Sequence, residues 1–335
     1  MKKQFLLITL LSLVSFISCA RQKLTNGLSY AEFSGDYKFD DFLKKGGAKT
    51  DKEVIDFLIE NVIAREGVLD DDTSLFTGAG CSTIQAGNNK DGFIFGRNFD
   101  WEDCNALILK TSPASGYKSI STVNIDFIKQ GAGRYSFLLT DSLINKIASY
   151  APLDGMNEKG LCVSVNMIED YERVNQKDGS KGNLTTTTAV RLLLDKASST
   201  REALSLLQEY NFNPSFGFCV HFAICDAQGN AVAVEYIDNK MSVIETPILT
   251  NFYVTPGNKY GIGTRESHER FNVLNKSIST KADIQKIGAV LESVSKHNYN
   301  EFEATQWSVV FDQKNLTATY FYRENYKQSW TYSLR

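Results

Sequence analysis

The sequence predicts an α+β fold in which two sheets pack face to face and a layer of helices covers each outer face. Segments with strand-like patterns alternate along the chain with two pairs of amphipathic helices. Each helix pair carries an apolar stripe that must be buried against another element. With 335 residues, of which 42% are hydrophobic, the chain is long and apolar enough to bury the core of such a four-layer fold. No repeat or second linker divides residues 81–335, which we expect to form one domain.

The first residues have the pattern of an export signal. Lys2 and Lys3 precede a short apolar stretch over residues 5–17, which is too short to span a membrane comfortably. We therefore assign residues 1–19 to an export signal. Cys19 stands where bacterial lipoprotein signals place the lipidated cysteine. We expect the protein in the periplasm or on the cell surface, tethered through a lipid on Cys19; plain secretion and a retained anchor are the alternatives.

Residues 20–80 have the character of a leader that precedes the main domain. Residues 20–50 are polar, rich in glycine and lysine, and show no period. The segment DKEVIDFLIENVIAREGVL (51–69) places apolar residues at helical spacing. Acidic residues stand near its start and Arg65 near its end, as the helix dipole favours. A run of aspartates and then TGAG (77–80) end this pattern. We expect a leader with one amphipathic helix.

After Cys81 the pattern becomes that of strands, interrupted by two helix pairs. We predict strands over 92–101, 107–112, 161–167 and 248–254, a meander over 219–245, and a closing hairpin over 307–325. We predict helices over 185–197, 199–210, 266–277 and 280–296, the second opening on a serine or threonine cap with Glu202. This order of elements underlies the four-layer prediction.

Composition and motifs exclude several classes of function. The net charge of −3 gives no reason to expect a nucleic-acid partner. The three histidines lie far apart, without a zinc-site spacing, and no glycine-rich phosphate loop or GxSxG motif is present. We therefore expect no metal and no cofactor. A Cys–His pair, formed by Cys81 with His221 or His268, stays open.

The stretch TGAGCST (77–83) places Cys81 after small, flexible residues. If the Gly80–Cys81 bond is cut, Cys81 gains an α-amino group whose pKa of about 7.7–8.0 lies near that of a thiol, about 8.5. That amine can accept the thiol proton near neutral pH, so no histidine is required. The glycines give the backbone the freedom that an N-to-S acyl shift needs. A buried core thiol in a loop is the alternative.

The motif GRNFDW (96–101) supplies charges that a hairpin would return to Cys81. On such a hairpin, Asp100 could hold the α-ammonium, and Arg97 could tune the thiolate or hold a substrate carboxylate. A surface salt bridge at a strand end is the alternative for these two residues.

The segment CSTIQAGNNKDGFIFGRNFDW (81–101) resembles the N-terminal motif of the choloylglycine hydrolase family, which comprises bile salt hydrolases, penicillin V acylases and their relatives. DGMNEKGLCVSVN (154–166), ILTNFYVTP (248–256) and SHERFNVL (267–274) are similar to further motifs of this family, and TQWSVVFDQKNLTATYFYRENY (305–326) is similar to the closing hairpin of its penicillin-acyltransferase-like branch. The resemblance implies a four-layer αββα sandwich of the N-terminal nucleophile hydrolase type.

The resemblance also implies residue roles. The catalytic residues that it implies are Cys81, Arg97, Asp100, Asn166, Asn251 and Arg270, with Arg265 as the alternative arginine. Cys81 is the nucleophile, Asp100 orients its amine, Asn166 or Asn251 holds the oxyanion, and the arginines complete a polar wall. Flanking residues that we expect to line an apolar acyl pocket are Phe99, Trp101, Met167, Phe252 and Tyr253.

The implied activity is hydrolysis of a linear N-acyl amide through a thioester. The expected small-molecule substrates are conjugated bile salts, N-acyl amines or amino acids, and penicillin V-type side chains. Bile salt hydrolases expose their cysteine by losing the initiator methionine, whereas here the leader 20–80 precedes Cys81. That departure resembles acyltransferase-like and acid-ceramidase-like relatives, which cut themselves before the cysteine. We expect the leader to stay bound as a small subunit; a disposable propeptide is the alternative, and a homo-oligomer stays open. An acyltransferase and a non-catalytic surface lipoprotein are the competing functions.

Overall fold

The computed structural model describes residues 21–63, 80–88, 90–131, 136–137, 139–170, 174–217, 219–297 and 303–335. The predicted export signal over 1–19, with the predicted lipid position at Cys19, lies outside the described residues, as does the end of the predicted leader over 64–79. Within the described part, no helix has both the length and the apolar character needed to cross a membrane.

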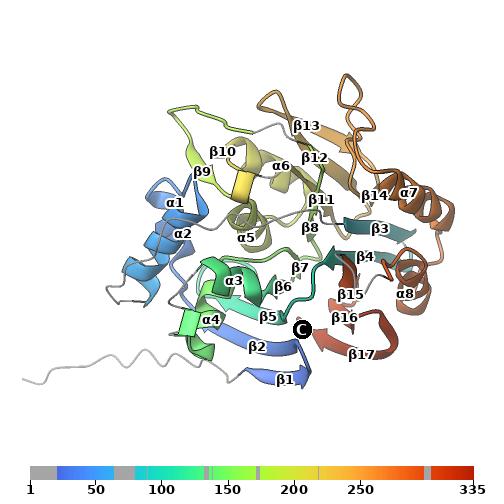
Figure 1. Cartoon of the computed structure of the whole chain (residues 1–335), viewed down its shortest axis with the longest axis horizontal. Helices are drawn as coiled ribbons and strands as arrows, with labels where there is room; N and C mark the ends of the chain where they lie inside the picture. The colour runs from blue at the N-terminus through green and yellow to red at the C-terminus, as the bar shows by residue number, and fades with distance from the viewer. Residues whose placement is uncertain are drawn as a thin grey trace, which may run out of the picture.

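Two sheets pack face to face (Figure 1). The larger sheet contains, in spatial order, β1 (Gln22–Thr25), β2 (Leu28–Gly35), β5 (Ala106–Pro113), β6 (Ser119–Asn124), β7 (Asp154–Asn157), β8 (Cys162–Met167), β11 (Val220–Cys225), β12 (Ala231–Ile237) and β13 (Lys240–Glu245). The smaller sheet contains β14 (Ile248–Leu249), β3 (Gly80–Asn88), β4 (Gly92–Trp101), β15 (Ala304–Asp312), β16 (Thr317–Tyr322) and β17 (Asn325–Ser333). A separate short parallel pair is formed by β9 (Gly182–Leu184) and β10 (Tyr210–Phe212).

Helices cover both outer faces, as the sequence predicts. α5 (Thr186–Lys196) and α6 (Thr200–Gln208) pack on the larger sheet, and α7 (Arg265–Ser277) and α8 (Ile284–Ser293) pack on the smaller one (Figure 1). The remaining helices are α1 (Phe39–Lys44), α2 (Asp51–Leu58), α3 (Ile125–Gly131) and α4 (Asp141–Ala148), with a π-helix over Ile59–Ile63 and a 3₁₀-helix over Ser215–Gly217. The predicted αββα arrangement is confirmed.

The helix starts are fixed by side-chain caps. Ser199 accepts a hydrogen bond from the backbone N–H of Glu202 at 3.3 Å, which is the cap that the sequence predicts for α6. Thr264 caps α7 through the N–H of Ser267 at 3.1 Å. These bonds satisfy N–H groups that would otherwise have no partner in the first turn.

The core that matters for the site lies between the two sheets. Cys81, Phe99 and Trp307 belong to this buried cluster, and the rings of Phe99 and Trp307 stack with their centroids 3.9 Å apart. Side chains alternate across a strand, so Ile84 on β3 faces the opposite way, into the cluster under α7 and α8. The thiol of Cys81 therefore points into the interior of the sandwich.

The leader is built into the sandwich more fully than the sequence predicts. β2 pairs in parallel with β5 along its whole length, from Leu28 opposite Ala106 to Gly35 opposite Pro113. The strands β1 and β2 and the helix α1 were not predicted, because this polar segment shows no clear period. The helix expected over 51–69 is an α-helix to Leu58 and a π-helix to Ile63, and its remainder lies outside the described residues.

Candidate active site

Cys81 is the second residue of β3, and its side chain is only 2% exposed. Its register partner on β4 is Phe99, so the thiol lies beside the aromatic core. Burial raises the pKa of the Cys81 thiol above its ordinary value, and the guanidinium of Arg97, with Nη2 3.7 Å from Sγ, acts in the opposite direction. The intact chain therefore holds a largely protonated, shielded thiol with one cation directed at it.

Arg97 is held in place by a buried carboxylate that the sequence analysis did not single out. Its Nη1 donates a hydrogen bond to Asp154, and its Nη2 donates to the carbonyl of Val165 at 2.8 Å. The same oxygen of Asp154 accepts from the indole N–H of Trp307 at 2.9 Å. Asp154 begins the DGMNEKGL motif, which gave the only sequence signal for it. The pair fixes the Arg97 cation beside the sulfur.

Asp100 returns on β4 to lie opposite Gly80, next to the predicted cleavage junction. Its Oδ1 accepts a hydrogen bond from Thr305 Oγ1 at 2.6 Å, and its Oδ2 is buried with no hydrogen-bond partner among the described residues. The nearest cation in the site is Arg270, whose Nη1 is 3.8 Å from Oδ2. A buried carboxylate oxygen without a donor is costly. An ammonium on Cys81 would supply that donor.

Asn251 and Arg270 contact the backbone of Cys81. The N–H of Cys81 donates to Asn251 Oδ1 at 2.7 Å, and Arg270 Nη2 donates to the same oxygen at 2.8 Å. Arg270 Nη1 also donates to the carbonyl of Cys81 and to Ser82 Oγ, both at 2.6 Å. The alternative arginine, Arg265, has a side chain that is 92% exposed and pairs with Glu269. The structure thus brings Arg270, and not Arg265, to Cys81.

Asn166 lies in the same region, but its amide is engaged elsewhere. Its Nδ2 donates to the carbonyls of Leu249 and Thr250, at 3.3 and 3.2 Å, and its Oδ1 accepts from Ser164. The next residue, Met167, gives its carbonyl to Asn251 Nδ2 at 2.7 Å. In the intact chain Asn166 therefore supports the segment that carries Asn251, and its role in holding an oxyanion stays a prediction.

The histidines are engaged with other partners. The ring nitrogens of His221 lie 3.0 Å from Glu235 Oε1 and 2.8 Å from the carbonyl of Thr250. His268 Nε2 lies 2.9 Å from the carbonyl of Gly261. Among the described residues, neither ring forms a hydrogen bond with Cys81, so the geometry does not favour the Cys–His alternative.

The five predicted pocket residues separate into two groups. Phe99 and Trp101 belong to the buried cluster that contains Cys81, and Met167 packs against it. Phe252 stacks on His268 of α7 with ring centroids 4.0 Å apart, and Tyr253 belongs to a small separate cluster. The first group shares the cluster of Cys81, whereas the second packs in other clusters.

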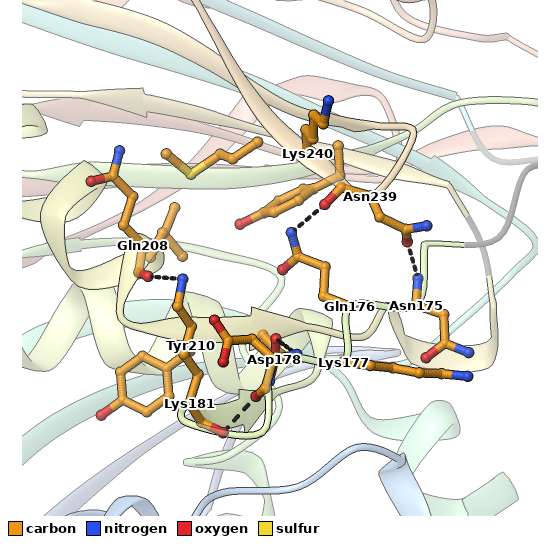
Figure 2. Close-up of a pocket in the computed structure, with 13 residues that line it drawn as sticks. Asn175, Gln176, Lys177, Asp178, Lys181, Gln208, Tyr210, Asn239 and Lys240 are labelled. Carbon is orange, nitrogen blue, oxygen red and sulfur yellow. Dashed lines mark hydrogen bonds between the residues drawn. The ribbon is translucent and has the colours of Figure 1, made fainter.

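A polar hollow of about 420 Å³ lies away from these residues (Figure 2). Its polar groups bond to one another: Gln176 Nε2 donates to the carbonyl of Asn239 at 2.7 Å, and Lys181 Nζ donates to that of Gln208 at 2.8 Å. None of the predicted site residues lines it. In the part of the chain that the structure describes, no group of three or more His, Cys, Asp or Glu side chains could hold a metal ion.

Comparison with known proteins gives one family match. The family described as acyl-coenzyme A:6-aminopenicillanic acid acyl-transferase matches residues 86–327. This range includes Arg97, Asp100, Asn166, Asn251 and Arg270, whereas Cys81 lies before its first residue.

Curated relatives are similar over part of the chain. A bile salt hydrolase/transferase of Lactiplantibacillus plantarum is 28% identical over 180 residues, which cover 50% of this chain and 51% of that protein. This chain thus spans about half the length of that relative. A penicillin V acylase of Pectobacterium atrosepticum is 24% identical over 287 residues, which cover 68% of this chain and 74% of that protein.

Solved structures show the same fold. A mutant of the conjugated bile acid hydrolase from Clostridium perfringens aligns with a TM-score of 0.55 at 17% identity, covering 76% of this chain and 92% of that one. The penicillin V acylase from Agrobacterium tumefaciens aligns with a TM-score of 0.51 at 18% identity, covering 72% and 83%. The N-terminal nucleophile hydrolase fold that the sequence predicts is confirmed.

Proposed function

The chain belongs to the acyl-coenzyme A:6-aminopenicillanic acid acyl-transferase family, and we propose from this that it is a cysteine amidohydrolase that cleaves the C–N bond of linear N-acyl amides. The observation that carries the proposal is the arrangement around Cys81: its N–H bonds to Asn251, its sulfur lies beside Arg97, and Asp100, which pairs in register with Gly80, has a buried oxygen without a donor among the described residues. The similarity to a bile salt hydrolase/transferase and to a penicillin V acylase supports this substrate class.

Maturation precedes turnover in this proposal. The Cys81 sulfur attacks the carbonyl carbon of Gly80, the Gly80–Cys81 C–N bond breaks, and the amide nitrogen takes up a proton to become the α-amine. Water then hydrolyses the thioester, which frees the sulfur and leaves a carboxylate on Gly80. Asn251, which accepts from the Cys81 N–H, and Asp100, which lies opposite Gly80, would receive the new amine.

Turnover uses that amine as the general base. It accepts the thiol proton, the thiolate attacks the substrate carbonyl, and the amine returns the proton to the leaving nitrogen. Asn251 Nδ2, Asn166 Nδ2 or a backbone N–H would hold the oxyanion; each such donor contributes about 10²–10³ in rate. Water then releases the acyl group. Phe99 and Trp101 belong to the buried cluster that contains Cys81, and Met167 packs against it, so an apolar acyl chain would rest there.

Export and attachment complete the proposal. The export signal over 1–19 and the lipid position at Cys19 would place the enzyme in the periplasm or at the cell surface. The pairing of β2 with β5 supports retention of the leader after cleavage, since losing it would expose an edge of the larger sheet.

The test is a panel of acyl amides incubated with the purified protein, with mass detection of released acid and amine. The panel contains glycine- and taurine-conjugated bile acids, N-acyl amines, N-acyl amino acids and penicillin V, with Cys81→Ala as the control. Release that depends on Cys81 supports the proposal and defines the substrate. Because the family and one relative carry acyl-transfer names, a second arm adds free amines as acceptors. Absence of turnover by cleaved protein on the whole panel would favour the non-catalytic alternative.

A further inference from the structure

A buried lysine that no motif indicates lies at the cleavage junction. Lys296, just after α8, is 8% exposed, and its Nζ pairs with Glu303 and, at 3.3 Å, with Glu266. Its backbone is also fixed: its N–H donates to Thr305 Oγ1 at 2.9 Å, and its carbonyl accepts from the N–H of Thr305 at 3.1 Å. Thr305 in turn donates to Asp100. Lys296 and Asp100 are thus held by a common residue.

Gly80 lies directly between these two side chains. A Cβ on Gly80 would lie 2.6 Å from Lys296 Cε, 3.0 Å from Lys296 Nζ and 2.8 Å from Asp100 Oδ2. Real Cβ atoms essentially never come closer than 3.0 Å to a heavy atom, so the contacts with Lys296 Cε and Asp100 Oδ2 would require a shift. The junction therefore has room for glycine alone unless Lys296 or Asp100 moves, and both are anchored by hydrogen bonds or ion pairs.

We propose that Lys296 is a positioning residue of this junction: its side chain restricts residue 80 to glycine, and its ammonium shares Asp100 with the α-amine that cleavage creates. The inference rests on the proposed self-cleavage. In the intact chain the Lys296 ammonium lies on the side of Asp100 that has no hydrogen-bond donor. After cleavage the α-ammonium of Cys81 becomes the donor to Asp100, and Lys296 stays beside it as a second cation.

The second cation favours the neutral amine, which is the form that acts as base. The charged groups that face this position come from every surrounding element, namely Arg97, Asp100, Glu266, Arg270, Lys296 and Glu303. Burial alone would lower the pKa of Lys296, but its bond to Glu303 raises it, so Lys296 is charged at neutral pH. Removing this cation leaves the carboxylates in excess and raises the pKa of the amine.

The steric part of the proposal is tested by a double-mutant cycle, in which intact-mass measurements over time give the rate of cleavage of each variant. Gly80→Ala should slow cleavage by about tenfold or more in the wild-type background, because the new methyl group overpacks the junction. In a Lys296→Ala background, where two of the three close contacts are gone, the same change should slow it by about threefold or less. An equal loss in both backgrounds would overturn this part.

The electrostatic part is tested by the pH profile of kcat/KM on cleaved enzyme, using the best substrate of the amide panel. Lys296→Met should move the acidic limb to higher pH by about one unit, and Lys296→Arg should restore it to within about 0.3 units. Lys286→Met, which removes an exposed lysine of α8, should leave the limb in place. An acidic limb that is the same in Lys296→Met and the wild type would overturn the proposal.

Failure of this inference is distinguishable from failure of the proposed function. If wild-type protein turns over fully without cleavage before Cys81, the proposed maturation is wrong. If the wild type is cleaved, but replacing Lys296 changes neither the effect of Gly80→Ala on the cleavage rate nor the pH profile of kcat/KM, only the inference is wrong. Lys296→Gln, which keeps most of the side-chain volume, replaces the methionine variant if that variant does not fold, and its thermal melt is measured alongside.

Discussion

At the scale of the residue, the site depends on charges that are buried and paired. Arg97 and Asp154 are both fully buried, and Trp307 adds a donor to the same carboxylate. A buried pair of this kind contributes little net stability, but breaking it leaves one uncompensated charge. Its use here is to direct a cation at Sγ of Cys81.

Asp154→Asn should therefore strongly destabilise the fold and lower the activity that depends on the Cys81 thiol. We expect a loss of about 3–5 kcal/mol in the free energy of unfolding, because the Arg97 cation stays buried without its anion. Since Arg97 would no longer be fixed, kcat/KM should also fall by about 100-fold. Chemical denaturation and steady-state kinetics measure both. Asp141→Asn, at an exposed helix start, is the matched control; an Asp154 variant as stable as that control would contradict the role given to the pair.

The two candidate arginines give a second prediction at this scale. Arg270→Ala should lower kcat/KM by about 100-fold, because the side chain holds both the Cys81 carbonyl and Asn251. Arg265→Ala should change kcat/KM by less than about twofold, because its side chain is exposed. Steady-state kinetics on both variants decide which arginine belongs to the site. A larger loss of kcat/KM in Arg265→Ala than in Arg270→Ala would assign the role to Arg265.

The sequence could predict residues that lie in recognisable motifs. The structure brings Cys81, Arg97, Asp100, Asn251 and Arg270 together, and each stands in a motif quoted from the sequence. Lys296 and Thr305 were not predicted as site residues, because their relation to Asp100 arises only when the segment after α8 packs against β4 and β15. Thr305 opens the closing-hairpin motif quoted from the sequence, but nothing in that motif marks it as a partner of Asp100, and Lys296 stands in no quoted motif.

At the scale of the element, the segment after β14 shows why one predicted strand is short. The sequence predicts a strand over 248–254, whereas the structure has only Ile248–Leu249. The backbone beyond it bonds to side chains: the N–H of Asn251 donates to Ser267 Oγ at 2.7 Å, and the N–H groups of Val254 and Thr255 donate to Glu235. Apolar patterning cannot reveal such partners. They hold the segment in the conformation that presents Asn251.

Glu235 gives a prediction about pH. Burial alone would raise the pKa of Glu235, but His221 and the backbone donors lower it below the ordinary 4.5. A lowered folded-state pKa means that the ionised group stabilises the fold above the unfolded-state pKa and that this contribution is lost as the pH falls through the folded value. The free energy of unfolding of the wild type should therefore decrease as the pH is lowered below about 4.5.

Glu235→Gln should lack this part of the acid dependence, because it has no proton to gain. Denaturation curves measured at intervals between about pH 3 and pH 6 compare the two proteins. We expect the gap in the free energy of unfolding to narrow towards the acid end. A gap that is constant with pH would contradict the linkage.

At the scale of the whole molecule, the leader and the main domain share one core. Phe42 of α1 and Phe57 of α2 pack with Tyr150, with ring centroids 5.2 to 6.2 Å apart. The fold class was predictable from the alternation of strands and helix pairs, whereas the place of the leader was not. Parallel pairing of β2 with β5 joins segments far apart in sequence, so the local pattern of residues 20–50 carries little trace of it.

The shared core predicts that the leader stays bound after cleavage. Cleaved protein should elute from a sizing column as one species containing both fragments, and separate only in denaturant. Phe42→Ala should destabilise this species by about 3–5 kcal/mol, because it empties a fully buried aromatic site. A main fragment that elutes alone, folded and active, would show that the leader is disposable.

The central claim is that Cys81 becomes the N-terminus of the active enzyme. It is tested most directly by intact mass and N-terminal sequencing of the purified protein under denaturing conditions, beside Cys81→Ala. We expect a fragment that begins at Cys81 in the wild type and an uncut, inactive chain in the variant. A fully active wild-type chain that is still joined at Gly80–Cys81 would contradict it.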